Sequence, residues 1–152
     1  MDECRVVELE ERDTAVVRAT VALAELPAFF ARAFPAVLTA LATLDVEPIG
    51  HPVAWYAGPP TDEVTLEAGF VVPRRIEPVG EVVASRLPGG RVVRAVHIGP
   101  YSTMTATYDR MRAWILEHSL IPTMPMWEVY LTDPGTDPDP ATWRTEICWP
   151  VT

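Results

Sequence analysis

The stretch WRTEICWPV at residues 143–151 shows a pattern that occurs a second time earlier in the chain and that indicates how the chain folds. They are rich in β-forming side chains, close with a proline, and carry one carboxylate, Glu146, in the middle. The earlier stretch VTLEAGFVVP at 64–73 has the same form, with Glu67 in the matching place. A carboxylate inside a mostly apolar strand is costly unless it is paired, hydrated or used. Two such acids at equivalent points of two half-chains predict one pocket between the halves.

The order of elements repeats along the chain. Valine-rich alternation predicts a strand over 4–21 with a bend near 11–13, and apolar residues at three- and four-residue steps predict helices near 26–44 and 101–118. Pro88-Gly89-Gly90 is typical of a hairpin turn between two strands. The remaining strands are expected at 51–57, 64–73, 81–87, 91–98, 126–132 and 143–151.

This pattern predicts one α+β domain over 1–152, made of two duplicated units at about 3–73 and 80–152. Each unit reads strand, helix, strand, strand. Antiparallel strands with helices confined to one face give an α+β sandwich. A chain of 152 residues with 49% hydrophobic residues is long and apolar enough for a sizeable core.

The charge, the apolar runs and the cysteine and histidine spacing limit the kinds of ligand and the location that are expected for this protein. The formal net charge of −9 argues against direct binding to nucleic acid or to an anionic membrane, and weakly favours a cationic small molecule. The charged N-terminus is no signal peptide, and no apolar run approaches the ~20 residues of a membrane span, so a cytoplasmic location is expected. The two cysteines and three histidines match no metal spacing, so neither a metal nor a cofactor is expected.

Strand alternation predicts which way the two acids point. Leu66, Ala68 and Phe70 share one face of their strand, as do Thr145, Ile147 and Trp149, and these faces should pack on the helices. Glu67 and Glu146 then point to the opposite face. Aromatic residues of neighbouring strands could wall a groove there: Trp55, Tyr56, Trp127 and Tyr130. Carboxylates among aromatic rings attract a cation.

Other side chains in the same strands have more ordinary interpretations. A salt bridge is the default role for Glu128, and core packing is the expected role of Tyr108 on its apolar helix stripe. Glu67 as a hydrogen-bonded structural acid stays an open alternative to a pocket role.

Three motifs together resemble the GyrI-like small-molecule-binding domain of the SOUL/GyrI-like superfamily, which is also the effector-binding domain of AraC- and MerR-type multidrug regulators. They are HIGPY at 97–101, MWEVYLTDP at 126–134 and WRTEICWPV, and PVAWYAGPPTDEVTLEAGFVV at 52–72 is similar to the first repeat of that family. The resemblance implies two βαββ repeats related by a pseudo-twofold axis, which enclose a channel for lipophilic, often cationic, compounds. It implies a ligand-facing glutamate at Glu146, with aromatic neighbours at Tyr101, Trp127, Tyr130 and Trp149.

Three functions follow from the residues and the resemblance. The first is a stand-alone binding protein for lipophilic or cationic compounds, since no helix-turn-helix precedes the domain in this sequence. The second is an enzyme similar to family members that open the cyclopropane ring of toxic natural products, with Glu146 as general acid or base, aided by Glu67 and Tyr101. The third is a protein-interaction role such as inhibition of DNA gyrase, which nothing local in the sequence specifies.

Overall fold

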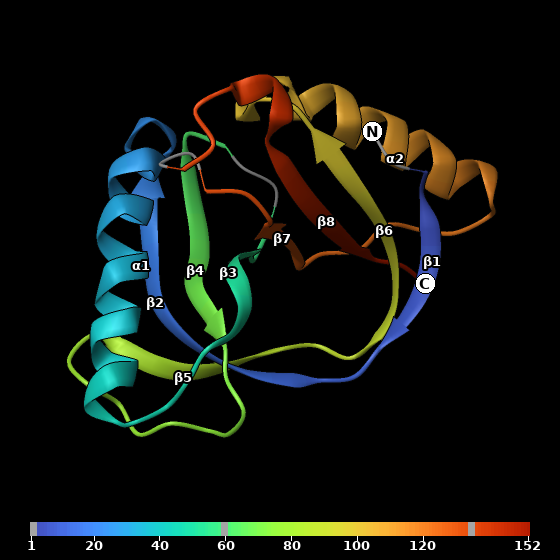
Figure 1. The fold of residues 1–152 in the computed structure, drawn as a ribbon. Helices are drawn as coiled ribbons and strands as arrows, with labels where there is room; N and C mark the ends of the chain where they lie inside the picture. The colour runs from blue at the N-terminus through green and yellow to red at the C-terminus, as the bar shows by residue number, and fades with distance from the viewer. Residues whose placement is uncertain (1–2, 59–60, 134–135) are drawn as a thin grey trace.

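The computed structural model describes residues 3–58, 61–133 and 136–152, which form an α+β fold with one curled antiparallel sheet (Figure 1). The helices of this part of the chain are α1 (Leu26–Thr43) and α2 (Met104–Glu117), and the short 3-10 turns are η1 (Leu23–Glu25), η2 (Tyr101–Thr103) and η3 (Pro140–Thr142). The strands are β1 (Arg5–Leu9), β2 (Arg12–Ala22), β3 (Ile49–Tyr56), β4 (Glu63–Val71), β5 (Val82–Leu87), β6 (Gly90–Ile98), β7 (Met126–Tyr130) and β8 (Arg144–Pro150).

The two halves of the chain have the same order, β2-α1-β3-β4 and β6-α2-β7-β8, as the sequence predicts. They join through an antiparallel seam between β3 and β7, in which Trp55 pairs with Trp127. The strand order across the whole sheet is β1-β6-β8-β7-β3-β4-β2-β5. Corresponding strands therefore lie on either side of the β3–β7 seam, which is the arrangement of two βαββ repeats about a pseudo-twofold axis.

The edge strands are exchanged between the halves. β1 pairs with β6, and β5 pairs with β2, so each edge strand adds to the other half of the sheet. The expected hairpin between 81–87 and 91–98 is therefore wrong, because β5 and β6 pair with other strands and Pro88-Gly89 is a corner. The segments that cross at this corner touch: a Cβ on Gly89 would lie 2.9 Å from the backbone N of Glu11. Figure 1 shows the two segments crossing at the bottom of the view.

Gly69 gives the most sensitive backbone contact of the sheet. A Cβ at this position in β4 would lie 1.9 Å from the carbonyl oxygen of Ala15, so Gly69→Ala requires the two central strands of the first half to separate. We expect the free energy of unfolding to fall by about 3 kcal/mol or more, measured by urea denaturation. Gly58→Ala is the matched control, because a Cβ there meets nothing within 4 Å. Equal stability of the two variants would contradict this packing.

Both helices pack on the same face of the sheet. Leu66, Ala68 and Phe70 of β4 are in the core under α1, and Ile147 of β8 is in the core under α2, as the alternation predicts. The opposite face is lined by a smaller cluster that includes Val53, Val71, Leu87, Val92, Trp127 and Cys148. The sheet is thus a single layer with apolar side chains packed on both sides.

The helical segment Leu23–Thr43 differs from the expectation of no membrane-length run. The segment has 21 residues, and an 18-residue window within it has a mean hydropathy of 1.4, so by length and composition alone it is long and apolar enough to cross a membrane. The segment was not expected because Glu25 and Arg32 interrupt the apolar run. In this fold Phe29, Ala33 and Val37 of the helix are buried against the sheet. Pro35 lies inside α1, which continues through it.

Candidate functional site

The acids and aromatic residues singled out from the sequence divide between the two faces of the sheet. Trp55 and Trp127 pair on the face opposite the helices, together with Glu146. Tyr56, one residue after Trp55, and Tyr130, three residues after Trp127, point to the helix face. The reason is the two-residue period of a strand, which sends neighbours to opposite sides. One groove therefore cannot hold all of them.

On the helix face, three tyrosine hydroxyls converge on the carboxylate of Glu128 in β7. Tyr130 donates at 2.8 Å and Tyr56 at 3.4 Å, and Tyr108 donates to the second carboxylate oxygen. Tyr108 comes from α2, Tyr56 from the last position of β3, and Tyr130 from the same strand as Glu128. The residue directly opposite Glu128 on β3 is the small Ala54, which leaves space for the rings.

An aromatic shell surrounds this carboxylate. Phe30 and Phe34 of α1 contact the ring of Tyr130, with centroids 5.9 and 6.2 Å away, and Tyr101 lies 5.9 Å from it on the other side. Two tryptophans complete the shell: Trp149 packs edge-on against Tyr108 at 5.8 Å, and Trp143 lies 5.1 Å from Tyr101. The helix-side position of Trp149 matches the parity of its strand.

Glu128 is 8% exposed, and no described Arg or His lies within ion-pair distance of it. Burial raises the pKa of this carboxyl above its ordinary 4.5, and the three hydroxyl donors partly oppose that rise. Burial and the neighbouring Glu128 in turn raise the pKa of each tyrosine, so all three keep their protons. The result is a carboxyl group held by neutral donors in a dry, aromatic environment.

Glu67 is engaged elsewhere. Arg18 donates to one carboxylate oxygen at 2.8 Å and Ser85 to the other at 2.6 Å. Arg18 and Glu67 lie on strands of the first half, and Ser85 lies on the exchanged edge strand β5. Its side chain is on the face opposite the helices, as expected, next to Trp55. Both oxygens of Glu67 thus accept hydrogen bonds from the protein itself, which favours the structural alternative of the sequence analysis.

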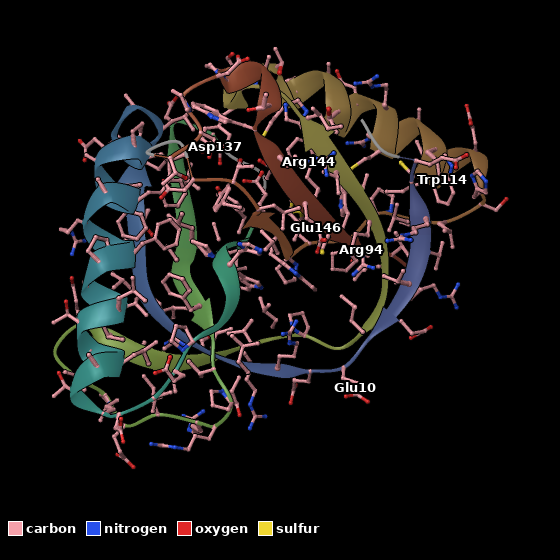
Figure 2. The ribbon with its side chains drawn as sticks, viewed as in Figure 1. Glu10, Arg94, Trp114, Asp137, Arg144 and Glu146 are labelled. Atoms are coloured by element: carbon pink, nitrogen blue, oxygen red, sulfur yellow. The ribbon has the colours of Figure 1, made fainter. Side chains whose placement is uncertain are left out.

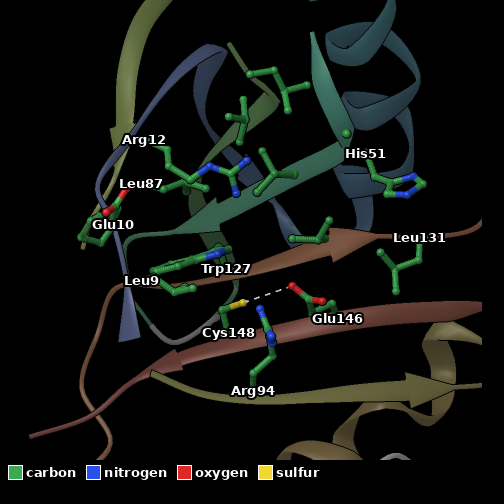
Figure 3. Close-up of a pocket in the computed structure, with 16 residues that line it drawn as sticks. Leu9, Glu10, Arg12, His51, Leu87, Arg94, Trp127, Leu131, Glu146 and Cys148 are labelled. Carbon is green, nitrogen blue, oxygen red and sulfur yellow. Dashed lines mark hydrogen bonds between the residues drawn. The ribbon is translucent and has the colours of Figure 1, made fainter. Parts of the chain in front are cut away.

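Glu146 lines a cavity of about 240 Å³ on the face opposite the helices (Figure 3). Of the residues singled out from the sequence, Trp127 also lines this cavity. The thiol of Cys148 donates a hydrogen bond to Glu146, with Sγ 3.6 Å from the carboxylate oxygen. In Figure 2, Glu146 and Arg94 extend from the adjacent strands β8 and β6 into the space enclosed by the curve of the sheet. Neither Glu67 nor Tyr101 reaches this cavity.

The family model for the GyrI-like small-molecule-binding domain matches residues 2–152. The chain belongs to this family. No curated protein matches the GyrI-like chain at a significant level. Among solved structures, the C-terminal domain of EcmrR is 18% identical, with a TM-score of 0.83 over 100% of this chain and 98% of that one. In the EcmrR–DNA complex the chain spans 57% of the longer protein, at 17% identity and a TM-score of 0.83.

Two further structures share the fold at lower identity. SAV2435, whose structure was solved bound to tetraphenylphosphonium, is 12% identical, with a TM-score of 0.68 and coverage of 99% of this chain and 94% of that one. A hydrolase from Listeria innocua is 14% identical, with a TM-score of 0.69 and coverage of 100% and 93%. At these identities the likeness shows a common GyrI-like fold.

Sequence reasoning missed Glu128 and Tyr108 as members of the candidate site in this GyrI-like domain. Glu128 was assigned a salt bridge and Tyr108 a core position. One signal was available: Glu128 and Tyr130 are two residues apart on a strand and so share a face. The contribution of Tyr108 from α2 required the packing of the helix on the sheet.

Proposed function

We propose that this GyrI-like protein binds lipophilic cations at Glu128, inside the aromatic shell on the helix face. The observation that carries the proposal is a buried carboxylate that accepts hydrogen bonds from three tyrosine hydroxyls and, among the described residues, has no basic side chain within ion-pair distance. A buried charge without a counter-charge is costly. A cationic ligand supplies that counter-charge.

The surroundings suit such a ligand in two further respects. The faces of Tyr, Trp and Phe rings attract cations, by about 0.5–2 kcal/mol per contact when desolvated. The net charge of −9 favours the approach of cations from solution. The small-molecule-binding character of the family and the tetraphenylphosphonium bound to SAV2435 are consistent with this chemistry.

Access to Glu128 requires a rearrangement of the shell. Tyr101 is 42% exposed and lies against both Tyr130 and Trp143, so it forms the outer edge of the site. A bulky ligand therefore has to displace this edge before its charge reaches the carboxylate. We expect the tryptophan fluorescence of the protein to change on binding, because Trp143 and Trp149 are in the shell.

The proposal is tested by fluorescence titration with tetraphenylphosphonium and with the neutral triphenylphosphine oxide. We expect the cation to bind about tenfold or more tightly than the neutral compound, because only the cation pairs with Glu128. Glu67→Gln is the control, because the carboxylate of Glu67 already accepts hydrogen bonds from Arg18 and Ser85. This substitution should leave the affinity for the cation unchanged. Equal affinity for the cation and the neutral compound would refute a role for charge.

A second candidate function, hydrolysis of an electrophilic small molecule, is favoured by the raised pKa of Glu128. A carboxyl group whose pKa is raised towards neutrality is suited to general acid–base catalysis. The acid–base group of this alternative is then Glu128 rather than Glu146, since Tyr101 lies on the helix side. Incubation with a cyclopropyl dienone separates the two functions: an enzyme consumes many equivalents, whereas a binding protein consumes none.

A further inference from the structure

We propose that the cavity beside Glu146 is a second ligand site, distinct from the Glu128 site, for a small zwitterion with an apolar side chain, of the size of an α-amino acid. The two sites are separated by the sheet itself. Glu146 pairs with Val129 of the neighbouring strand, and Glu128, the residue before Val129, points to the other face. Ligands at the two sites would lie back to back across one layer of strands.

The cavity is enclosed on several sides. Its lining includes Val53, Val71 and Trp127 of the apolar cluster on this face, together with Leu9 and Leu87 at the ends of the two crossing segments. Its volume of about 240 Å³ corresponds to roughly eight water molecules at ~30 Å³ each. This is below the ~300–1,000 Å³ of pockets for drug-sized ligands, so the cavity suits a smaller molecule.

Two charged groups of opposite sign face this space with unused hydrogen-bonding capacity. Arg94 and Glu146 come from adjacent strands and line the same cavity (Figure 3), yet they form no ion pair with one another. Within the described residues, the guanidinium of Arg94 donates no hydrogen bond, although it carries five N–H donors. In the part of the chain that the structure describes, the carboxylate of Glu146 accepts a hydrogen bond only from the thiol of Cys148, which is a weak donor.

The charge balance of the lining distinguishes this cavity from a cation site. It contains two acids, Glu10 and Glu146, and two arginines, Arg12 and Arg94, in a protein whose net charge is −9. An arginine recognises a carboxylate, and a carboxylate recognises an ammonium group. A molecule that carries both groups on one carbon atom satisfies both side chains, and its apolar side chain then covers Trp127 and Val129.

Cys148 serves as a neutral donor in this arrangement. Its side chain is 1% exposed, and burial together with the nearby Glu146 raises the pKa of the thiol. The sulfur therefore keeps its proton, which it donates to Glu146. No bond-forming step is implied for it.

The experiment compares three probes by calorimetry: L-leucine, 4-methylpentanoate, which lacks the ammonium group, and isoamylamine, which lacks the carboxylate. We expect L-leucine to bind about tenfold or more tightly than either single-charge probe, because each loses one charge-assisted contact. Glu146→Gln should remove the advantage over 4-methylpentanoate, and Arg94→Gln the advantage over isoamylamine. The thermal unfolding of each variant confirms that it is folded.

Glu128→Gln is the control that tests whether the two sites are separate. It should leave the binding of L-leucine unchanged. In turn, Glu146→Gln should leave tetraphenylphosphonium binding unchanged, so a failure of either proposal is visible without the other. The second site is refuted if no probe binds the wild-type protein, if folded Arg94 and Glu146 variants bind L-leucine as the wild type does, or if Glu128→Gln abolishes L-leucine binding.

Discussion

Glu128→Gln will weaken the binding of tetraphenylphosphonium by about 2 kcal/mol or more, which is about 30-fold, while the protein stays folded. The substitution removes the negative charge and keeps the shape of the side chain. Its amide can still accept from Tyr130 and Tyr56 through the carbonyl oxygen. The loss of affinity then reports on the charge alone, and is measured by fluorescence titration or calorimetry.

The stability of the free Glu128→Gln protein provides the control. Because burial raises the pKa of Glu128, its ionised form is disfavoured by the fold. The stability that this group contributes is present below pH 4.5 and is lost as the pH rises through the raised pKa. At pH 8 the neutral variant should therefore be at least as stable as the wild type in urea denaturation. A variant that is stable and still binds the cation with wild-type affinity would contradict the assignment of Glu128.

The affinity for the cation will rise with pH in the wild-type protein and become constant above the pKa of Glu128. The cation pairs with the ionised carboxylate, so below that pKa the protein must release a proton on binding. Each pH unit below it lowers the affinity by about tenfold. As the pH is lowered, the affinity for the cation begins to fall at a pH above 4.5, because the pKa of Glu128 is raised from that value.

Calorimetry in two buffers with different ionisation enthalpies measures the released proton directly. We expect close to one proton per bound cation at low pH and none at high pH. Glu128→Gln should show neither the proton release nor the pH dependence, whereas Glu146→Gln should keep both. A pH-independent affinity in the wild-type protein would mean that the ligand binds without the help of this carboxylate.

The pairing of the edge strands illustrates a limit of local patterns. The strands at 82–87 and 90–98 and the turn residues between them are evident in the sequence, and the simplest interpretation was a hairpin. A turn signal predicts that the chain changes direction, but it does not identify the partner of the strand that follows. In the structure β5 pairs with β2, and β6 pairs with β1, because the two halves exchange their edge strands where the chain segments cross at Gly89.

The alternation of WRTEICWPV was informative because it is a purely local property. It predicted that Ile147 and Trp149 face the helices and that Glu146 faces the other way, and the structure has them so. The duplicated order of strands and helices was equally accessible, since it depends on periodicity and on turn residues.

The sequence by itself determined the fold class, the duplication and the faces of the two strands that carry Glu67 and Glu146, because these follow from the two-residue period of strands and the periodicity of helices. Only the tertiary structure decided which acid is surrounded by tyrosines. Tyr56, Tyr108 and Tyr130 come from three elements and meet at Glu128 only after α2 packs on the sheet and β3 pairs with β7. The physical reason is that a strand pattern assigns a side chain to a face, whereas its surroundings depend on which distant elements cover that face.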